Sequence, residues 1–222
     1  EMINGDWSSD VCSSDLDTKA FLADLLEQLK SIDYIKPVDI PNIDLYMDQI
    51  TTFMDEQLAA SKRYESDKIL TKTMINNYAK NNLLPPPSKK KYSKEHVLTL
   101  LFIYYFKNIL SINDIHSILN PLTEKYFGNT DGFSMVDIYN EVFGLEAEES
   151  KKLMKDLGKK YNLAKDTFND FPEEDQKFLH TFSFICMLSF DVYIKKMIIE
   201  RTIDNLNNEA ASEKDNKNKS DQ

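Results

Sequence analysis

Hydrophobic and polar positions repeat at helical spacing along most of the chain, and no alternating strand pattern of useful length interrupts them. Thr71, Ser93 and Ser111 are predicted N-caps, and Ser134 with Asp137 forms a capping-box start. The predicted helices span residues 16–29, 43–58, 71–82, 92–110, 111–119, 134–143, 147–157 and 173–206. The pattern therefore predicts an all-α protein.

The ends of the chain differ from its middle. Residues 6–16 match the translated end of a common sequencing-library adapter, so we interpret residues 1–16 as artefactual or disordered and exclude them from fold reasoning. The alternative is a genuine polar arm rich in Ser and Asp. The predicted parts that follow are an N-terminal helix and linker over 17–41, a module over 42–120, a helical effector or dimerisation region over 121–206, and a disordered polar tail over 207–222.

Charge is distributed unevenly. The 222 residues include 27 basic and 37 acidic side chains, which gives a net charge of −10 and excludes a uniformly basic coat for nucleic acid. Residues 62–94, in contrast, hold nine basic and two acidic residues, a net charge of +7. This block is the place where a local basic patch is expected.

Signs of a membrane span or of catalytic chemistry are weak. Once residues 1–16 are excluded, Cys186 is the only cysteine, which suits a reducing compartment, so we expect a cytoplasmic protein. Phe178–Ile194 approaches a membrane span in length, but His180 and Asp191 interrupt it, which favours a buried core or dimer helix. The histidines are isolated, and no phosphate-binding Gly loop, nucleophile elbow or metal-ligand spacing is present. We therefore expect neither an enzyme nor a bound cofactor or metal.

The predicted helix over 71–82 has the polarity of a helix that enters the major groove of DNA. Ile75, Tyr78 and Ala79 share one face, and Lys, Thr and Asn side chains lie largely on the other. Asn can pair bidentately with adenine, and Lys and Thr can contact bases or phosphates. A triple-Pro corner and a Lys-rich tip follow, where a wing would contact the phosphate backbone. The predicted DNA-binding residues are Lys72, Thr73, Asn76, Asn77, Lys80, Lys89, Lys90, Lys91 and Lys94.

The order of these parts resembles the MerR-type winged helix-turn-helix. The shared positions are Thr71, Ile75, Tyr78, Leu83-Leu84, Pro86, Tyr92-Ser93, Phe102 and the stretch Leu110–Leu119. The chain differs in having Asn76 where that family has Arg, in its shorter wing, and in using Ile43–Leu58 as the first helix.

A longer string resembles the bacterial domain of unknown function 1836. It comprises Ile43–Gln49, Leu70–Tyr78, Pro85–Pro87 and Lys90–His96, within a resemblance over roughly residues 40–200. This resemblance implies a cytosolic protein of low-GC Gram-positive bacteria with a MerR-like DNA-binding module.

The resulting prediction is a sequence-specific transcriptional regulator that binds double-stranded DNA as a homodimer, with an unidentified protein or small-molecule effector and no membrane partner. Helix 71–82 would enter the major groove, and Lys89–Lys91 would contact phosphates. Phe178–Ile203 could supply the dimer seam. The alternative is an adaptor that uses the winged fold to dock a protein, which the net charge of −10 favours.

Overall fold

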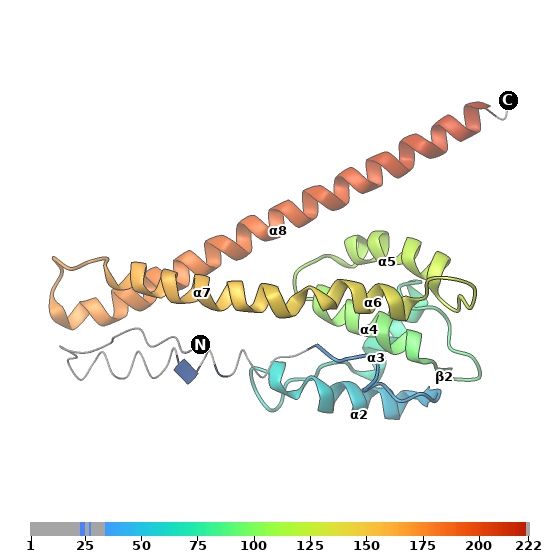
Figure 1. Ribbon diagram of the computed structural model, residues 1–222, viewed down its shortest axis with the longest axis horizontal. Coiled ribbons are helices and arrows are strands. Elements are labelled where there is room, and N and C mark those ends of the chain that lie inside the picture. The colour runs from blue at the N-terminus through green and yellow to red at the C-terminus, as the bar shows by residue number, and fades with distance from the viewer. Residues whose placement is uncertain (1–22, 25–26, 28–33, 221–222) are drawn as a thin grey trace.

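The computed structural model describes residues 23–24, 27 and 34–220, and it is built mainly of helices (Figure 1). The elements are β1 (Leu45–Tyr46), α2 (Met47–Gln57), the short 3-10 helix η1 (Ala59–Ser61), α3 (Lys72–Lys80), β2 (Lys91–Tyr92), α4 (Lys94–Phe106), α5 (Ile112–Tyr126), α6 (Met135–Gly144), α7 (Glu146–Lys165) and α8 (Glu173–Ser220). The all-α prediction is confirmed. The suspected artefact over 1–16 lies outside the described residues, as does most of the predicted helix over 16–29.

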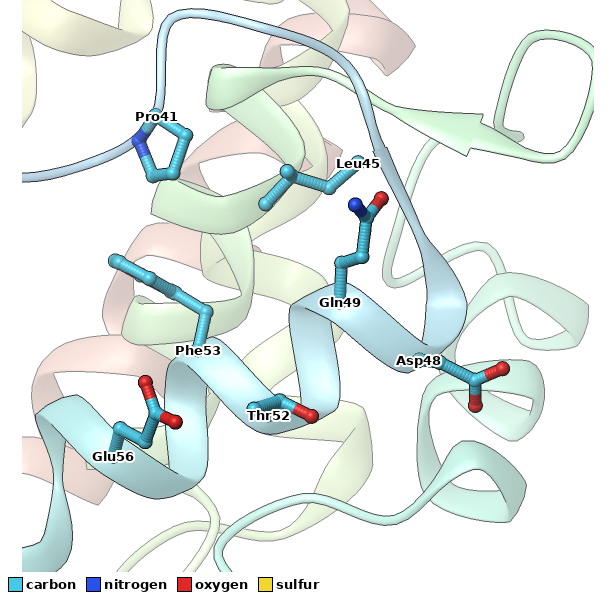
Figure 2. Close-up of a pocket in the computed structure, with 7 residues that line it drawn as sticks. All are labelled: Pro41, Leu45, Asp48, Gln49, Thr52, Phe53 and Glu56. Atoms are coloured by element: carbon cyan, nitrogen blue, oxygen red, sulfur yellow. The ribbon is translucent and has the colours of Figure 1, made fainter.

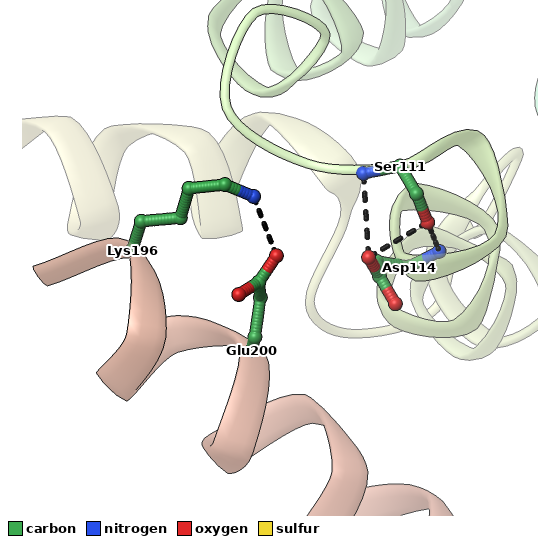
Figure 3. A network of polar contacts seen from close by, with 4 residues as sticks. All are labelled: Ser111, Asp114, Lys196 and Glu200. Atoms are coloured by element: carbon green, nitrogen blue, oxygen red, sulfur yellow. Dashed lines mark hydrogen bonds and ion pairs between the residues drawn. The ribbon is translucent and has the colours of Figure 1, made fainter. Parts of the chain in front are cut away.

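The helix starts follow local capping signals. The Thr71 hydroxyl accepts a hydrogen bond from the Met74 amide at the start of α3. At the start of α5 the Ser111 and Asp114 side chains satisfy each other's amides (Figure 3). Ser134 begins α6 with the same motif. Each cap satisfies amides that would otherwise lack partners, so these starts could be predicted from the sequence alone.

The main core surrounds α4. Every side chain from Val97 to Ile103 is buried, which is typical of a helix with neighbours on all sides. Aromatic rings of α6 pack against it: the ring centroids of Phe102 and Tyr139 lie 5.5 Å apart, and those of Tyr139 and Phe143 lie 4.4 Å apart. Ile75 of α3 belongs to the same cluster, so the helix of functional interest is anchored directly in the core.

A short antiparallel pairing joins two segments that are distant in sequence. Leu45 of β1 lies opposite Tyr92 of β2, and Tyr46 lies opposite Lys91. The expected helix over 43–58 therefore begins only at Met47, because its first residues pair with β2 instead.

A second, smaller core lies between α7 and α8. The chain turns back at residues 166–172, and Leu157, Tyr161 and Ala164 of α7 pack against Phe184 of α8. Lys160 of α7 pairs with Asp156 and with Asp191 of α8, and these bonds raise the pKa of its ammonium group. In Figure 1, α8 continues far beyond this contact and ends well away from the bundle.

At two of the predicted helix ends, the prediction is wrong because tertiary packing outweighs local signals. α5 passes through Pro121 to Tyr126, and Leu122 beyond the proline packs against the main core. α7 passes through Gly158 to Lys165, because Tyr161 and Ala164 beyond it are buried. An interior glycine costs about 1 kcal/mol, whereas burial of one large apolar side chain contributes about 1.5–3 kcal/mol.

The tail over 207–222, which the sequence predicts to be disordered, is described as helix up to residue 220, because α8 runs to Ser220. Extending an existing helix needs no new nucleation, and this segment contains good helix formers but no Pro or Gly. The Asn205 amide donates to the Glu209 carboxylate at 2.8 Å, one turn further along the helix. Among the described residues, no helix has both the length and the hydrophobicity that crossing a membrane requires.

Candidate nucleic-acid interface

α3 separates its apolar and polar faces as predicted. Ile75 and Tyr78 are buried, and desolvation raises the pKa of the Tyr78 hydroxyl. All five predicted DNA-contacting side chains of α3 are exposed: Lys72, Thr73, Asn76, Asn77 and Lys80. The helix is closed by Asn82, whose φ of 56° lies in the left-handed region that Asn tolerates. The apolar side of α3 is thus buried in the core, and its polar side is exposed to solvent.

The Lys-rich tip forms a tight turn. The Lys91 amide donates to the Ser88 carbonyl at 2.9 Å, and the two residues between them, Lys89 and Lys90, have φ values of 50° and 64°. Both side chains are exposed. Left-handed backbone at a non-glycine residue costs about 1–2 kcal/mol, and such costs persist where the surrounding structure enforces the conformation. Here the pairing of β1 with β2 fixes the far side of the turn.

The start of α2 links this turn to α3. β1 leads directly into α2, and Asp48 in the first turn of α2 forms an ion pair with Lys72 at the start of α3. At Tyr46, the residue just before α2, the Lys91 ammonium lies 5.2 Å from the centre of the tyrosine ring. Lys72 and Lys91 therefore flank the short segment from Tyr46 to Asp48. Because the Asp48–Lys72 pair is exposed, it contributes little stability.

The predicted site residues are not all brought together. Lys72, Lys89, Lys90 and Lys91 lie around the start of α2, whereas Lys80 lies at the opposite end of α3, about 12 Å along the helix. Lys94 is partly buried in the first turn of α4, directly after β2. The arrangement thus spreads positive charge along the exposed side of α3 and gathers most of it at the turn.

A shallow hollow of about 360 Å³ lies along α2, from its first turn to its last (Figure 2). Its floor is apolar and its edge carries the carboxylates of Asp48 and Glu56, as Figure 2 shows. Sequence reasoning missed this feature, because it depends on how the chain before β1 packs against α2. The lining residues are Pro41, Leu45, Asp48, Gln49, Thr52, Phe53 and Glu56.

His96 is a further buried residue whose role the sequence did not indicate. Its Nδ1 atom accepts the Ser93 amide at 2.9 Å, and its ring lies between those of Tyr92 and Phe127, with centroids 5.4 Å and 4.7 Å away. Burial lowers the pKa of the imidazole. The backbone carbonyls of Pro86 and Pro85 oppose this lowering, although Nε2 has no partner in normal hydrogen-bond geometry. The only available signal was its position three residues after a capping Ser.

We expect His96 to make the fold less stable in mild acid. The folded state holds the imidazole neutral, while the unfolded chain takes up a proton near pH 6.5, so stability falls as the pH drops below that value. The loss from one such group is at most about 1.4 kcal/mol per pH unit. His96→Gln keeps an acceptor for the Ser93 amide, and its urea unfolding should depend less on pH between 7.5 and 5.5. Equal pH dependence in both chains would contradict this role.

The described residues contain no group of three or more His, Cys, Asp or Glu that could hold a metal ion. The fold and the site together define a helical protein with an exposed polar helix beside a Lys-tipped turn. Residues 35–142 match the family model described as Domain of unknown function (DUF1836), which supports the family resemblance over this segment. The match covers β1 to nearly all of α6 and stops before α7 and α8. The searches of curated proteins and of solved structures return no match.

Proposed function

We propose that the segment from β1 to α5 binds double-stranded DNA as a sequence-specific transcriptional regulator of MerR-like winged-helix type. The observation that carries this proposal is the polar side of α3, which is exposed along the whole helix while its apolar side is anchored in the core. The element order supports the proposal, because two helices followed by a tight turn and a third helix are what we expect of a winged helix-turn-helix of this type.

Each part of this surface has a distinct role in the proposal. The B-DNA major groove is about 12 Å wide and accepts one α-helix. Asn76, in the middle of α3, would contact base edges, and Lys72 and Lys80 at its ends would contact phosphates. The turn at Lys89–Lys91 would contact the backbone alongside the groove. Each phosphate contact makes binding more sensitive to salt, with a log–log slope of about −0.9 per contact.

Two substitutions in α3 should separate base contacts from phosphate contacts. Asn76→Ala should weaken binding to the preferred duplex by about 5- to 150-fold, with little effect on an unrelated duplex, because it removes a base contact. Lys80→Ala should weaken both duplexes alike and make the salt slope shallower by about 1. Fluorescence anisotropy measures both effects, using a 30-base-pair duplex from upstream of the protein's own operon and a shuffled duplex. If both variants bind both duplexes as the parent chain does, α3 is not the recognition helix.

The hollow beside α2 favours a second candidate function, an adaptor that docks another protein. Its apolar floor could take an apolar side chain, and its carboxylate edge repels a phosphate backbone. Glu56→Lys reverses one charge of that edge on an exposed side chain. An adaptor predicts a stoichiometric protein partner that this substitution displaces, together with no duplex binding at either low or high salt. The DNA-binding proposal predicts that Glu56→Lys leaves duplex binding intact or strengthens it.

A further inference from the structure

α8 carries a row of apolar side chains that its own fold leaves exposed. Phe178, Ile185, Val192, Ile199 and Leu206 follow one another at intervals of seven residues. Their exposed fractions range from 38% at Ile199 to 71% at Phe178. A seven-residue apolar repeat is the pattern by which one helix packs along another, because it keeps a single seam in contact over several turns.

The polar groups of the same stretch are used inside the chain, on the opposite side. Asp191 pairs with Lys160 of α7, and Nε2 of His180 lies 2.8 Å from the Thr167 carbonyl oxygen. Phe184 is buried against α7. The outward side of residues 178–194 therefore presents apolar or small side chains without a charge: Phe178, Phe182, Ile185, Cys186, Ser189, Phe190, Val192 and Tyr193.

We propose that this outward face, residues 178–194 of α8, packs against the same face of a second copy of the chain, with the two helices antiparallel. The exposed area of this face is comparable to the area that a stable interface buries per partner. Phe178, Phe182, Phe190 and Tyr193 are each 51–71% exposed. Aromatic side chains can bury about 150–250 Å² each, so their exposed parts alone offer roughly 500 Å² per copy. Ile185 and Val192 bring the total closer to the ~800 Å² per partner of a standard interface.

Charge at the two ends of the face favours antiparallel over parallel packing of the two helices. Residues 173–177 at one end hold three acidic residues and one Lys, and residues 195–201 at the other end hold three basic residues and one Glu. Glu174 lies one turn before Phe178, and Lys196 one turn after Val192, so both continue the apolar row. Antiparallel packing places each acidic end beside a basic end, whereas parallel packing would place like charges together.

The structure also limits how far the seam extends. Ile203 is buried in the main core, and α5 packs against α8 in the same region. Figure 3 shows the Lys196–Glu200 pair of α8, which is formed within that helix, together with Ser111 and Asp114 at the start of α5. The expected seam over Phe178–Ile203 therefore narrows to residues 178–194. This pairing does not depend on DNA binding, because it uses none of the residues assigned to the nucleic-acid interface.

Sedimentation velocity of the full chain over a concentration series tests the pairing. The parent chain should be a dimer, and Phe182→Ser combined with Ile185→Ser should weaken dimerisation at least about 100-fold, since the double change acts in both copies. Phe133→Ser is the matched control, because Phe133 is 75% exposed but lies outside α8. Circular dichroism checks that each variant keeps its helices. A parent chain that is monomeric throughout, or a double variant that dimerises as tightly as the control, would overturn the proposal.

Carbodiimide cross-linking of the same dimer tests its direction. The reagent joins a carboxylate directly to a lysine, and Glu174 and Lys196 of one helix are separated by about 33 Å, so a link between them must join two copies. Antiparallel packing predicts links from residues 173–175 to Lys195 or Lys196 in the dimer fraction. A dimer fraction that lacks these links would overturn the antiparallel arrangement. Reversing both lysines to Glu should weaken dimerisation about two- to tenfold, and additional reversal of Glu173 and Glu174 to Lys should restore it.

Discussion

Replacing Lys89, Lys90 and Lys91 together with Ala is expected to weaken binding to every duplex and to flatten its dependence on salt. If all three contact phosphates, the log–log salt slope becomes shallower by about 2.7, because each lost contact removes about 0.9. The loss is expected to be independent of sequence, since phosphates carry no base information. Stability should change little, because the Lys89 and Lys90 side chains are exposed and the half-buried Lys91 contributes a ring contact with Tyr46.

A second triple variant, with the same change in net charge, serves as the control. Lys151, Lys155 and Lys159 form an exposed row on α7, outside the proposed interface, and their replacement with Ala removes the same three charges. Anisotropy between 50 and 200 mM KCl with two unrelated duplexes should show the large effect only for the turn. Equal weakening by both triple variants would mean that overall charge, and not this turn, determines binding.

Ile75→Ala is expected to cost about 2–5 kcal/mol of unfolding free energy, the range for truncating a fully buried aliphatic side chain. Ile75 has no exposed surface and joins α3 to the main core. Urea unfolding followed by circular dichroism measures the loss as a lower midpoint at unchanged slope.

The neighbouring residue supplies the control for this measurement. Asn76 is exposed, so Asn76→Ala should stay within about 0.5 kcal/mol of the parent chain. The two adjacent substitutions should therefore separate stability from function: the first destabilises the fold, and the second weakens duplex binding in a fully folded chain. A large stability loss in Asn76→Ala would mean that the polar side of α3 is packed against the protein itself.

The sequence predicted the parts of the fold that depend on local interactions. Thr71, Ser111 and Ser134 begin helices through bonds to residues three positions away, so short motifs were sufficient to locate them. Helix ends at Pro121 and Gly158 were mispredicted. Buried side chains beyond these two residues, and the neighbouring helices they pack against, keep the chain helical there. Local propensity is weaker than such packing.

In the candidate site, too, the sequence predicted the local features but not those that depend on tertiary packing. The exposed face of α3 followed from the spacing of Ile75 and Tyr78, which is a property of one helix. The ion pair between Lys72 and Asp48 could not be predicted, because it depends on how α2 and α3 pack against each other. The left-handed turn at Lys89 and Lys90 was equally hidden, since Lys is not a residue that favours such a turn.

Amide hydrogen exchange of the full chain, with and without the duplex from upstream of its operon, tests the central claim most directly. The account predicts slower exchange on binding in residues 72–80 and 88–91, with α7 unchanged as the internal reference. Binding that leaves these two segments unaffected, or that protects the hollow beside α2 instead, would contradict the assignment of α3 and the Lys-tipped turn to DNA.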